Sequence, residues 1–151
     1  MNRSSSGVTI IELLLVVFII STITLLSAPF YSRFLTQNAV GNTADQLVGS
    51  LRKAQIYSMM GKQNNSWGVK YVTTPSKKIT LYLTGNGAFD ENYTVNDNIT
   101  VSGFTDTSFA KVTGIPSPGP FPLTITISGG NNTKTITINS QGVVCRQSTC
   151  P

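Results

Sequence analysis

One acidic residue stands inside an otherwise apolar segment near the start of the chain. Glu12 is the only charged residue between positions 8 and 28. An acid at the centre of a membrane-length helix costs roughly 2.5–3.5 kcal/mol, and such residues are functional by default. The chemistry open to a lone carboxylate here is charge pairing. The less demanding interpretation is an acid tolerated near the interface, where it leans toward lipid headgroups.

Two cysteines offer a second kind of chemistry. Cys145 and Cys150 are the only cysteines, and four residues separate them near the end of the sequence. Outside the cytoplasm a pair this close is expected to oxidise, so we predict a structural disulfide. The small loop that it closes serves either as a staple for the tail or as an interaction surface.

The sequence offers little for catalysis. It contains no histidine, no glycine-rich nucleotide loop and no readable pair of catalytic acids. Without histidine, and without a C-x-x-C motif, neither a zinc site nor a redox dithiol is expected. We therefore predict a protein that is not an enzyme, with no catalytic residues and no cofactor.

One stretch gathers oxygen-bearing side chains of the kind that bind calcium. Its members are Asp90, Glu91, Asn92, Asp97 and Asn98. Their spacing lacks the alternating aspartates and closing glutamate of a calcium loop. We predict a solvated loop and no metal site, with calcium binding as the lesser alternative.

The charge is low and mildly basic. Only 11% of the residues are charged, and the formal net charge is +5. The cations considered for nucleic acid are spread along the sequence, and only two of them are adjacent: Lys62, Lys70, Lys77, Lys78, Lys111, Lys134 and Arg146. A basic solvated surface is expected, with weak, non-specific DNA binding as the alternative.

The apolar run that carries Glu12 is long enough to cross a bilayer. A helix over residues 8–28 spans roughly the hydrocarbon core. Arg3 is the only charge before it, which favours a cytoplasmic leader and an outward C-terminal part. A cleaved secretory signal fits poorly, because residues 26–28 read Leu-Ser-Ala rather than small-x-small. A plain membrane anchor stays open.

This N-terminal segment resembles that of type IV prepilins and of the pseudopilins of type II secretion. The match rests on Gly7, on residues 8–17 (VTIIELLLVV) and on Pro29. The resemblance implies that a prepilin peptidase cuts between Gly7 and Val8 and methylates the new amine of Val8. The family usually has Phe or Met at that first mature position, so Val8 is a departure.

The resemblance also assigns roles within the helix. It implies that Glu12, the fifth mature residue, pairs with the N-terminal amine of a neighbouring subunit and so sets the stagger between subunits. It implies a kink at Pro29, where Ser21, Thr22, Thr24 and Ser27 could satisfy the freed carbonyls. The resemblance further implies that the chain first resides in the inner membrane. It then assembles with other copies of itself or with other pilins in a helical filament.

The second half of the helix is predicted to be amphipathic. Its apolar residues follow helical spacing along one stripe: Val40, Ala44, Leu47, Val48, Leu51 and Ala54. Gly61 is the predicted stop. Beyond it the sequence predicts strands near residues 67–72, 79–83, 99–101, 123–128, 134–139 and 143–144. We expect a turn at Asn86-Gly87, a loop over residues 114–122, and a connection over residues 129–133.

These expectations combine into an α+β pilin fold. A long bent N-terminal helix would pack on an antiparallel sheet or a β-sandwich-like head. The predicted parts are a removed leader (1–7), a transmembrane or filament-core helix (8–29), an amphipathic helix (30–62) and a β-rich head with a C-terminal disulfide loop (63–151). Residues 51–55, 67–69 and 136–142 resemble the H-type minor pseudopilins, in which the head is sandwich-like.

The predicted function is structural. The chain would be a subunit of a type IV pilus or related pseudopilus, serving adhesion, motility, DNA uptake or secretion. The alternative is a minor pilin or pseudopilin whose head binds DNA or a secretion substrate. We expect a single-pass protein of the cytoplasmic membrane with its head outward before assembly, and a place in an extracellular pilus or periplasmic pseudopilus afterwards.

Overall fold

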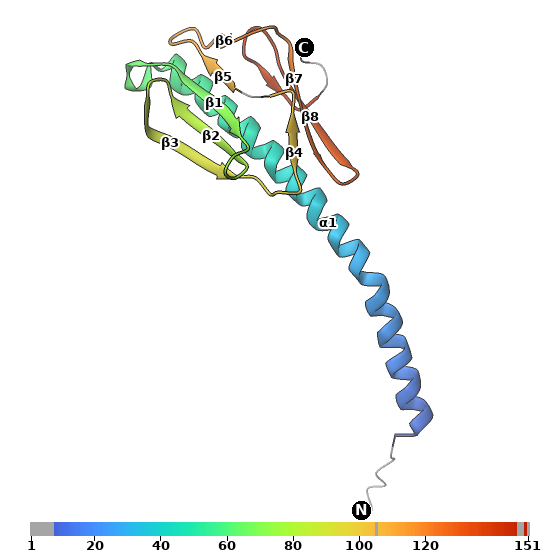
Figure 1. The fold of residues 1–151 in the computed structure, drawn as a ribbon. Helices are drawn as coiled ribbons and strands as arrows, with labels where there is room; N and C mark the ends of the chain where they lie inside the picture. The colour runs from blue at the N-terminus through green and yellow to red at the C-terminus, as the bar shows by residue number, and fades with distance from the viewer. Residues whose placement is uncertain (1–7, 105, 148–149, 151) are drawn as a thin grey trace, which may run out of the picture. The chain divides into compact units, whose positions relative to one another are not determined.

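The protein consists of one long helix followed by antiparallel strands (Figure 1), so the α+β class is confirmed. The computed structural model describes residues 8–104, 106–147 and 150, and at residues 26–29 the backbone alone. The chain divides into two compact units, residues 1–35 and residues 36–151. The second unit contains the end of the helix and every described strand.

The helix α1 runs from Ile10 to Met59. The whole predicted stripe is buried, with Leu47, Leu51 and Ala54 fully enclosed. Gly61 follows with a φ of 62°, in the left-handed region that glycine adopts freely. Its amide donates to the carbonyl of Ser58 at 3.0 Å. The predicted stripe and the predicted stop are therefore both confirmed.

Five strands form the first antiparallel sheet, in the order β3-β2-β1-β5-β6. A short 3-10 turn, Lys62–Asn64, leads from α1 into it. The strands are β1 (Trp67–Val72), β2 (Lys78–Leu83), β3 (Asn86–Thr94), β5 (Asp106–Phe109) and β6 (Pro116–Ser117). β1 lies in the middle, pairing with β2 along its whole length and with β5 over four residues.

Four strands form the second antiparallel sheet, in the order β4-β7-β8-β9. They are β4 (Thr100–Ser102), β7 (Leu123–Gly129), β8 (Asn132–Ile138) and β9 (Val144–Cys145). The predicted hairpin is present, but its strands pair as far as Gly129 and Asn132. Only Gly130 and Asn131 are left for the turn, and Gly130 has a φ of 55°. The predicted five-residue connection is thus wrong, because a tight two-residue turn suits the twist of a hairpin better.

One hydrophobic core joins the stripe of α1 to both sheets. Alternate residues of the hairpin point into it, as period-two patterning requires: Ile125, Ile127, Ile136 and Ile138 are all fully buried. From the first sheet, Trp67, Leu81 and Phe109 contribute large buried side chains. The hairpin therefore covers the helix stripe with its isoleucine face, as expected.

Three strands and one turn differ from the expectation. β3 and β5 were not predicted, and the first of them, Asn86–Thr94, is polar and has no buried residue. The turn before β3 falls at Thr84 and Gly85, with a φ of 82° at the glycine, whereas Asn86-Gly87 opens the strand. A polar edge strand shows no hydrophobic alternation, so its sequence cannot be distinguished from that of a loop. The expected loop 114–122 also contains the short strand β6.

The buried stripe generates a stability prediction. Leu51→Ala should lower the free energy of unfolding by about 2–5 kcal/mol, because it leaves a cavity in a fully enclosed site. Urea unfolding followed by tryptophan fluorescence measures the change. Ile56→Ala, on the exposed side of the same helix, is the matched control and should change stability by less than about 1 kcal/mol. Equal losses in the two variants would contradict the packing described.

Candidate functional site

The start of α1 presents Glu12 in a helix-capping position. Glu12 lies in the first turn, and its amide donates to the carbonyl of Thr9 at 3.1 Å and contacts the Thr9 hydroxyl oxygen at 3.4 Å. The spacing Thr-x-x-Glu is that of a capping box, in which the carboxylate also faces the positive end of the helix dipole. This capping spacing was not predicted from the sequence, although Thr9 lies three residues before Glu12.

The carboxylate of Glu12 takes part in none of the ion pairs found among residues 8–104, 106–147 and 150. Those pairs join Lys53 to Glu91, Lys70 to Asp90, and Arg146 to Asp45. Val8 stands at the same end of the helix with 72% of its side chain exposed. The predicted cleavage position Gly7 and the leader 1–7 lie outside the described residues.

The apolar part of α1 is a candidate membrane span by length and composition. Its best 18-residue window has a mean hydropathy of 2.6, and none of that window is buried. A signal sequence near an N-terminus has these same properties. Large apolar side chains from Val8 to Leu25, and again from Phe30 to Leu35, stand about half exposed or more.

The helix backbone continues through Pro29, and the predicted kink stays a prediction. Three hydroxyls before the proline donate to backbone carbonyls one turn earlier. Ser21 bonds to Val17 at 2.7 Å, and Thr22 and Thr24 bond to Ile19 and Ile20, each at 2.8 Å. A proline at position 29 frees the carbonyl four residues before it. These three hydroxyls therefore do not serve that carbonyl, contrary to the expectation, and the fourth residue named for this role, Ser27, has a side chain outside those that the structure describes.

The predicted disulfide is present. Cys145 and Cys150 are joined, with their Cα atoms 5.6 Å apart. The tail around them is held to the head by further contacts. Arg146 pairs with Asp45 of α1, and Arg52 of α1 donates to the carbonyl of Val144 at 3.1 Å. Thr137 of β8 donates to the carbonyl of Gln147 at 2.6 Å. These contacts favour the interpretation of the loop as a staple.

The acidic stretch considered for calcium lies mainly on a strand, so the expectation of a loop is wrong for its first half. Asp90, Glu91 and Asn92 belong to β3. Lys53 contacts the carboxylate of Glu91 at 2.6 Å, and Lys70 lies 3.6 Å from Asp90. Within the described part of the chain, no three histidine, cysteine or acidic side chains gather as metal ligands. The carboxylates instead hold lysines of α1 and β1.

Four of the cations considered for DNA are bonded to other groups of the protein. Lys70 and Arg146 are ion-paired. Lys77 donates to the carbonyls of Asp97 and Ile99, at 2.6 and 2.8 Å. Lys111 bonds to the side chain of Asn64. The two ion pairs and the two short carbonyl bonds leave Lys70, Lys77 and Arg146 with less to offer a phosphate, whereas the partner of Lys111 is uncharged.

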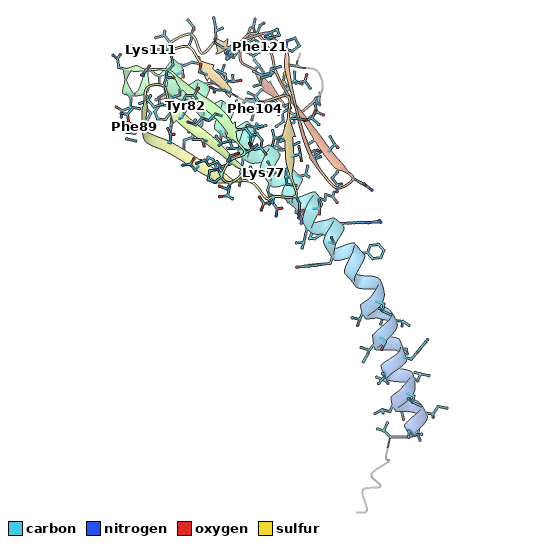
Figure 2. The ribbon with its side chains drawn as sticks, viewed as in Figure 1. Lys77, Tyr82, Phe89, Phe104, Lys111 and Phe121 are labelled. Carbon is cyan, nitrogen blue, oxygen red and sulfur yellow. A yellow bond between two sulfur atoms is a disulfide. The ribbon has the colours of Figure 1, made fainter. Side chains whose placement is uncertain are left out.

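A cavity of about 550 Å³ opens where the two sheets meet. It is lined by residues in or directly after β1 and β4, by the start of β5, and by the start of β7 with the segment before it: Tyr71, Thr73, Val101, Gly103, Phe104, Asp106, Pro118, Gly119, Pro120 and Leu123. Asp106 is the charged residue of this lining, and it accepts a hydrogen bond from Tyr82 at 2.8 Å. Figure 2 labels Tyr82 and Phe104 in this region. The lining contains no nucleophile with an adjacent base.

No protein-family model matches the chain, and neither the curated proteins nor the solved structures searched contain a match.

The disulfide generates a testable prediction. Replacing both Cys145 and Cys150 by serine should lower the free energy of unfolding by about 2 kcal/mol, the loop-entropy value for a ring of this size. Denaturant unfolding of the oxidised protein and of the double variant measures the difference. The wild type under reducing conditions is the control, and it should match the variant. No difference would show that the other tail contacts alone hold the C-terminus.

The Lys53–Glu91 pair generates a pH prediction. The hydrogen bond from Lys53 holds the pKa of Glu91 below its ordinary 4.5, and the same bond raises the pKa of Lys53 above 10.5. The stabilisation of the folded head by this pair is therefore fully present above the ordinary carboxyl pKa of 4.5 and below the ordinary lysine pKa of 10.5. It is lost as pH falls through the lowered pKa of Glu91. Because the pair is partly exposed, Glu91→Gln should lower Tm near neutral pH by at most about 4 °C.

Melting curves of the wild type and of Glu91→Gln from pH 7 down to about pH 2 test this expectation. The difference between the two proteins should begin to shrink as pH falls below the ordinary carboxyl pKa, and it should vanish below the lowered pKa of Glu91. Asp97→Asn, which removes a carboxylate outside the described ion pairs, is the control. A difference that stays constant with pH would contradict the assignment.

Proposed function

We propose that the chain is a prepilin-like subunit of a type IV pilus or related pseudopilus. Its leader is removed after Gly7, Val8 becomes the methylated N-terminus, and the apolar half of α1 passes from the cytoplasmic membrane into the core of a filament. The observation that carries the proposal is the division of apolar surface along one helix. Buried residues begin at Val40, whereas large side chains before it stand exposed.

Exposed apolar surface on this scale must be covered. A soluble monomer rarely shows a contiguous apolar patch beyond a few hundred Å². The helix before Val40 presents Ile, Leu, Val and Phe on all sides, so a single neighbour on one face cannot cover it. A bilayer can, and so can a bundle of parallel copies around it. Both environments occur in the life of a pilus subunit.

Glu12 supports assembly rather than simple anchoring. An unpaired carboxylate in lipid or in a dry filament core is costly, and a cation beside it removes much of that cost. Cleavage after Gly7 creates such a cation at Val8. The amine lies four residues before Glu12, about 6 Å along the helix axis. A parallel neighbour displaced by that distance brings its amine beside this carboxylate. One pair thus both neutralises the charge and sets the stagger.

The head supports the same proposal. A helix whose second half packs its apolar stripe against antiparallel strands is the arrangement that a pilin fold requires. Two separate sheets, of five and four strands, agree with the sandwich-like head of the H-type minor branch rather than with one simple sheet. The disulfide agrees with a head outside the cytoplasm.

Mass spectrometry of a sheared surface-filament fraction tests the proposal. We expect a chain that begins at methylated Val8 and is lighter by two hydrogens because of the disulfide. Abundance in that fraction distinguishes a major subunit from a minor one. A chain that keeps Met1–Gly7 and stays in the membrane fraction would overturn the proposal.

Substitution of Glu12 tests its role in assembly. Glu12→Ala and Glu12→Gln should both be processed normally, yet enter filaments about tenfold less or worse, because the neighbour's amine loses its partner. Thr9→Val is the control: it removes the capping hydroxyl and keeps the carboxylate, so it should assemble. Quantitative immunoblots of membrane and filament fractions measure both steps. Normal incorporation of Glu12→Ala would show that the charge has no part in assembly.

A further inference from the structure

Exposed apolar side chains of the head gather where α1 ends. Within the described part of residues 36–151, seven large apolar side chains are exposed. Six of them form what we call the Met60 patch: Ile56, Met59, Met60, Val112, Ile115 and Val143. The seventh, Phe89, stacks edge-on against Trp67. Apolar residues scattered singly are ordinary on a surface, but such a concentration marks an interaction site.

Hydrogen bonds join the three segments that carry these side chains. The first segment is the last turn of α1, and the amide of Val112 donates to the Ser58 carbonyl there at 3.0 Å. The side-chain amide of Gln55 donates to the carbonyls of Gly114 and Gln141, at 3.2 and 3.3 Å. The loops that carry Val112, Ile115 and Val143 are thus bound to one helix end. Figure 2 shows Lys111, next to Val112, at this end of the head.

Backbone strain is concentrated at the same place. Three non-glycine residues of the described chain have a left-handed φ, namely Gln63, Asn64 and Val112, at 59°, 57° and 70°. For a β-branched residue such as Val112 this conformation is a genuine outlier. Strained residues persist only where the surrounding structure holds them in place, and they cluster at functional sites. Here it holds a valine out in solvent, with 66% of its side chain exposed.

Three cations near the end of α1 have uncharged partners. Arg52 donates to a backbone carbonyl, Lys111 to an asparagine side chain, and Lys62 stands 3.6 Å above the ring of Tyr57. These partners are all uncharged. The carboxylate of Glu91, which also attracts Lys62, is paired with Lys53. The end of α1 therefore combines protruding apolar side chains with a net positive rim.

We propose that the Met60 patch docks on the surface of an anionic phospholipid bilayer. Its aliphatic side chains, with Met60 exposed by 75% and Val112 by 66%, would enter the boundary between headgroups and acyl chains, while Arg52, Lys62 and Lys111 meet the phosphates. Apolar area and cations together set the strength of such binding. A second copy would need free acidic residues to meet these cations, but most acidic residues of the head already hold internal partners. The positive charge of the rim therefore favours an anionic lipid surface over a second copy. The inference is independent of the proposed function.

A sedimentation experiment with the full chain tests this proposal. The chain is held by its N-terminal helix in phosphatidylcholine nanodiscs and mixed with heavy vesicles. One vesicle set is phosphatidylcholine alone, and the other contains about one-third phosphatidylglycerol. We expect the protein to pellet with the anionic vesicles only, and to be released by high salt.

Variants assign the binding to the patch. Met60→Ser with Val112→Asn should weaken it by about tenfold. This variant should fold normally, because both side chains are exposed and asparagine tolerates a positive φ. Phe89→Ser removes an exposed apolar side chain outside the patch and should bind as the wild type does. Lys111→Gln should weaken binding by about fivefold, whereas its control Lys134→Gln should have little effect.

Several outcomes would overturn the proposal. They are absence of binding to anionic vesicles, equal binding to both vesicle sets, or unchanged binding by the Met60→Ser/Val112→Asn variant. If the chain ignores vesicles but self-associates through its head, and that double variant abolishes the association, the patch is a protein interface instead. Thermal melts of every variant check that the head remains folded.

Discussion

The structure depends on where apolar surface is covered within the chain and where it is not. From Val40 onward, the stripe of α1 is buried against two sheets in one core. Before that residue, the same helix exposes large apolar side chains around its circumference. The hydrophobic effect therefore stabilises the head from within and leaves the first half to an external environment. The assembly role proposed for Glu12 follows from that external environment, whereas its capping position depends only on the first turn of the helix.

Much of the head could be predicted because its elements follow simple periods. The stripe of α1 has helical spacing, and the β7–β8 hairpin alternates isoleucine with threonine, so both were found from sequence alone. β3 was missed because it is a polar edge strand that buries nothing and therefore needs no alternation. β5 was missed because its four residues are too few to show a period.

The functional residues also divide into those that the sequence reveals and those that only the fold reveals. Glu12 and the two cysteines are visible in the sequence because each is a rare type in its setting. The Lys53–Glu91 pair is not visible, since its members are 38 residues apart and meet only when β3 lies beside α1. The Met60 patch is likewise assembled from a helix end and two loops, each of which looks ordinary alone. Only folding brings their exposed side chains together.

The end of α1 has a consequence for the cooperativity of unfolding. One core contains the buried stripe of this helix together with side chains of both sheets. Neither sheet can therefore leave the helix without exposing apolar residues of the shared core to water. The two sheets and the helix residues between them should unfold together, in a single transition.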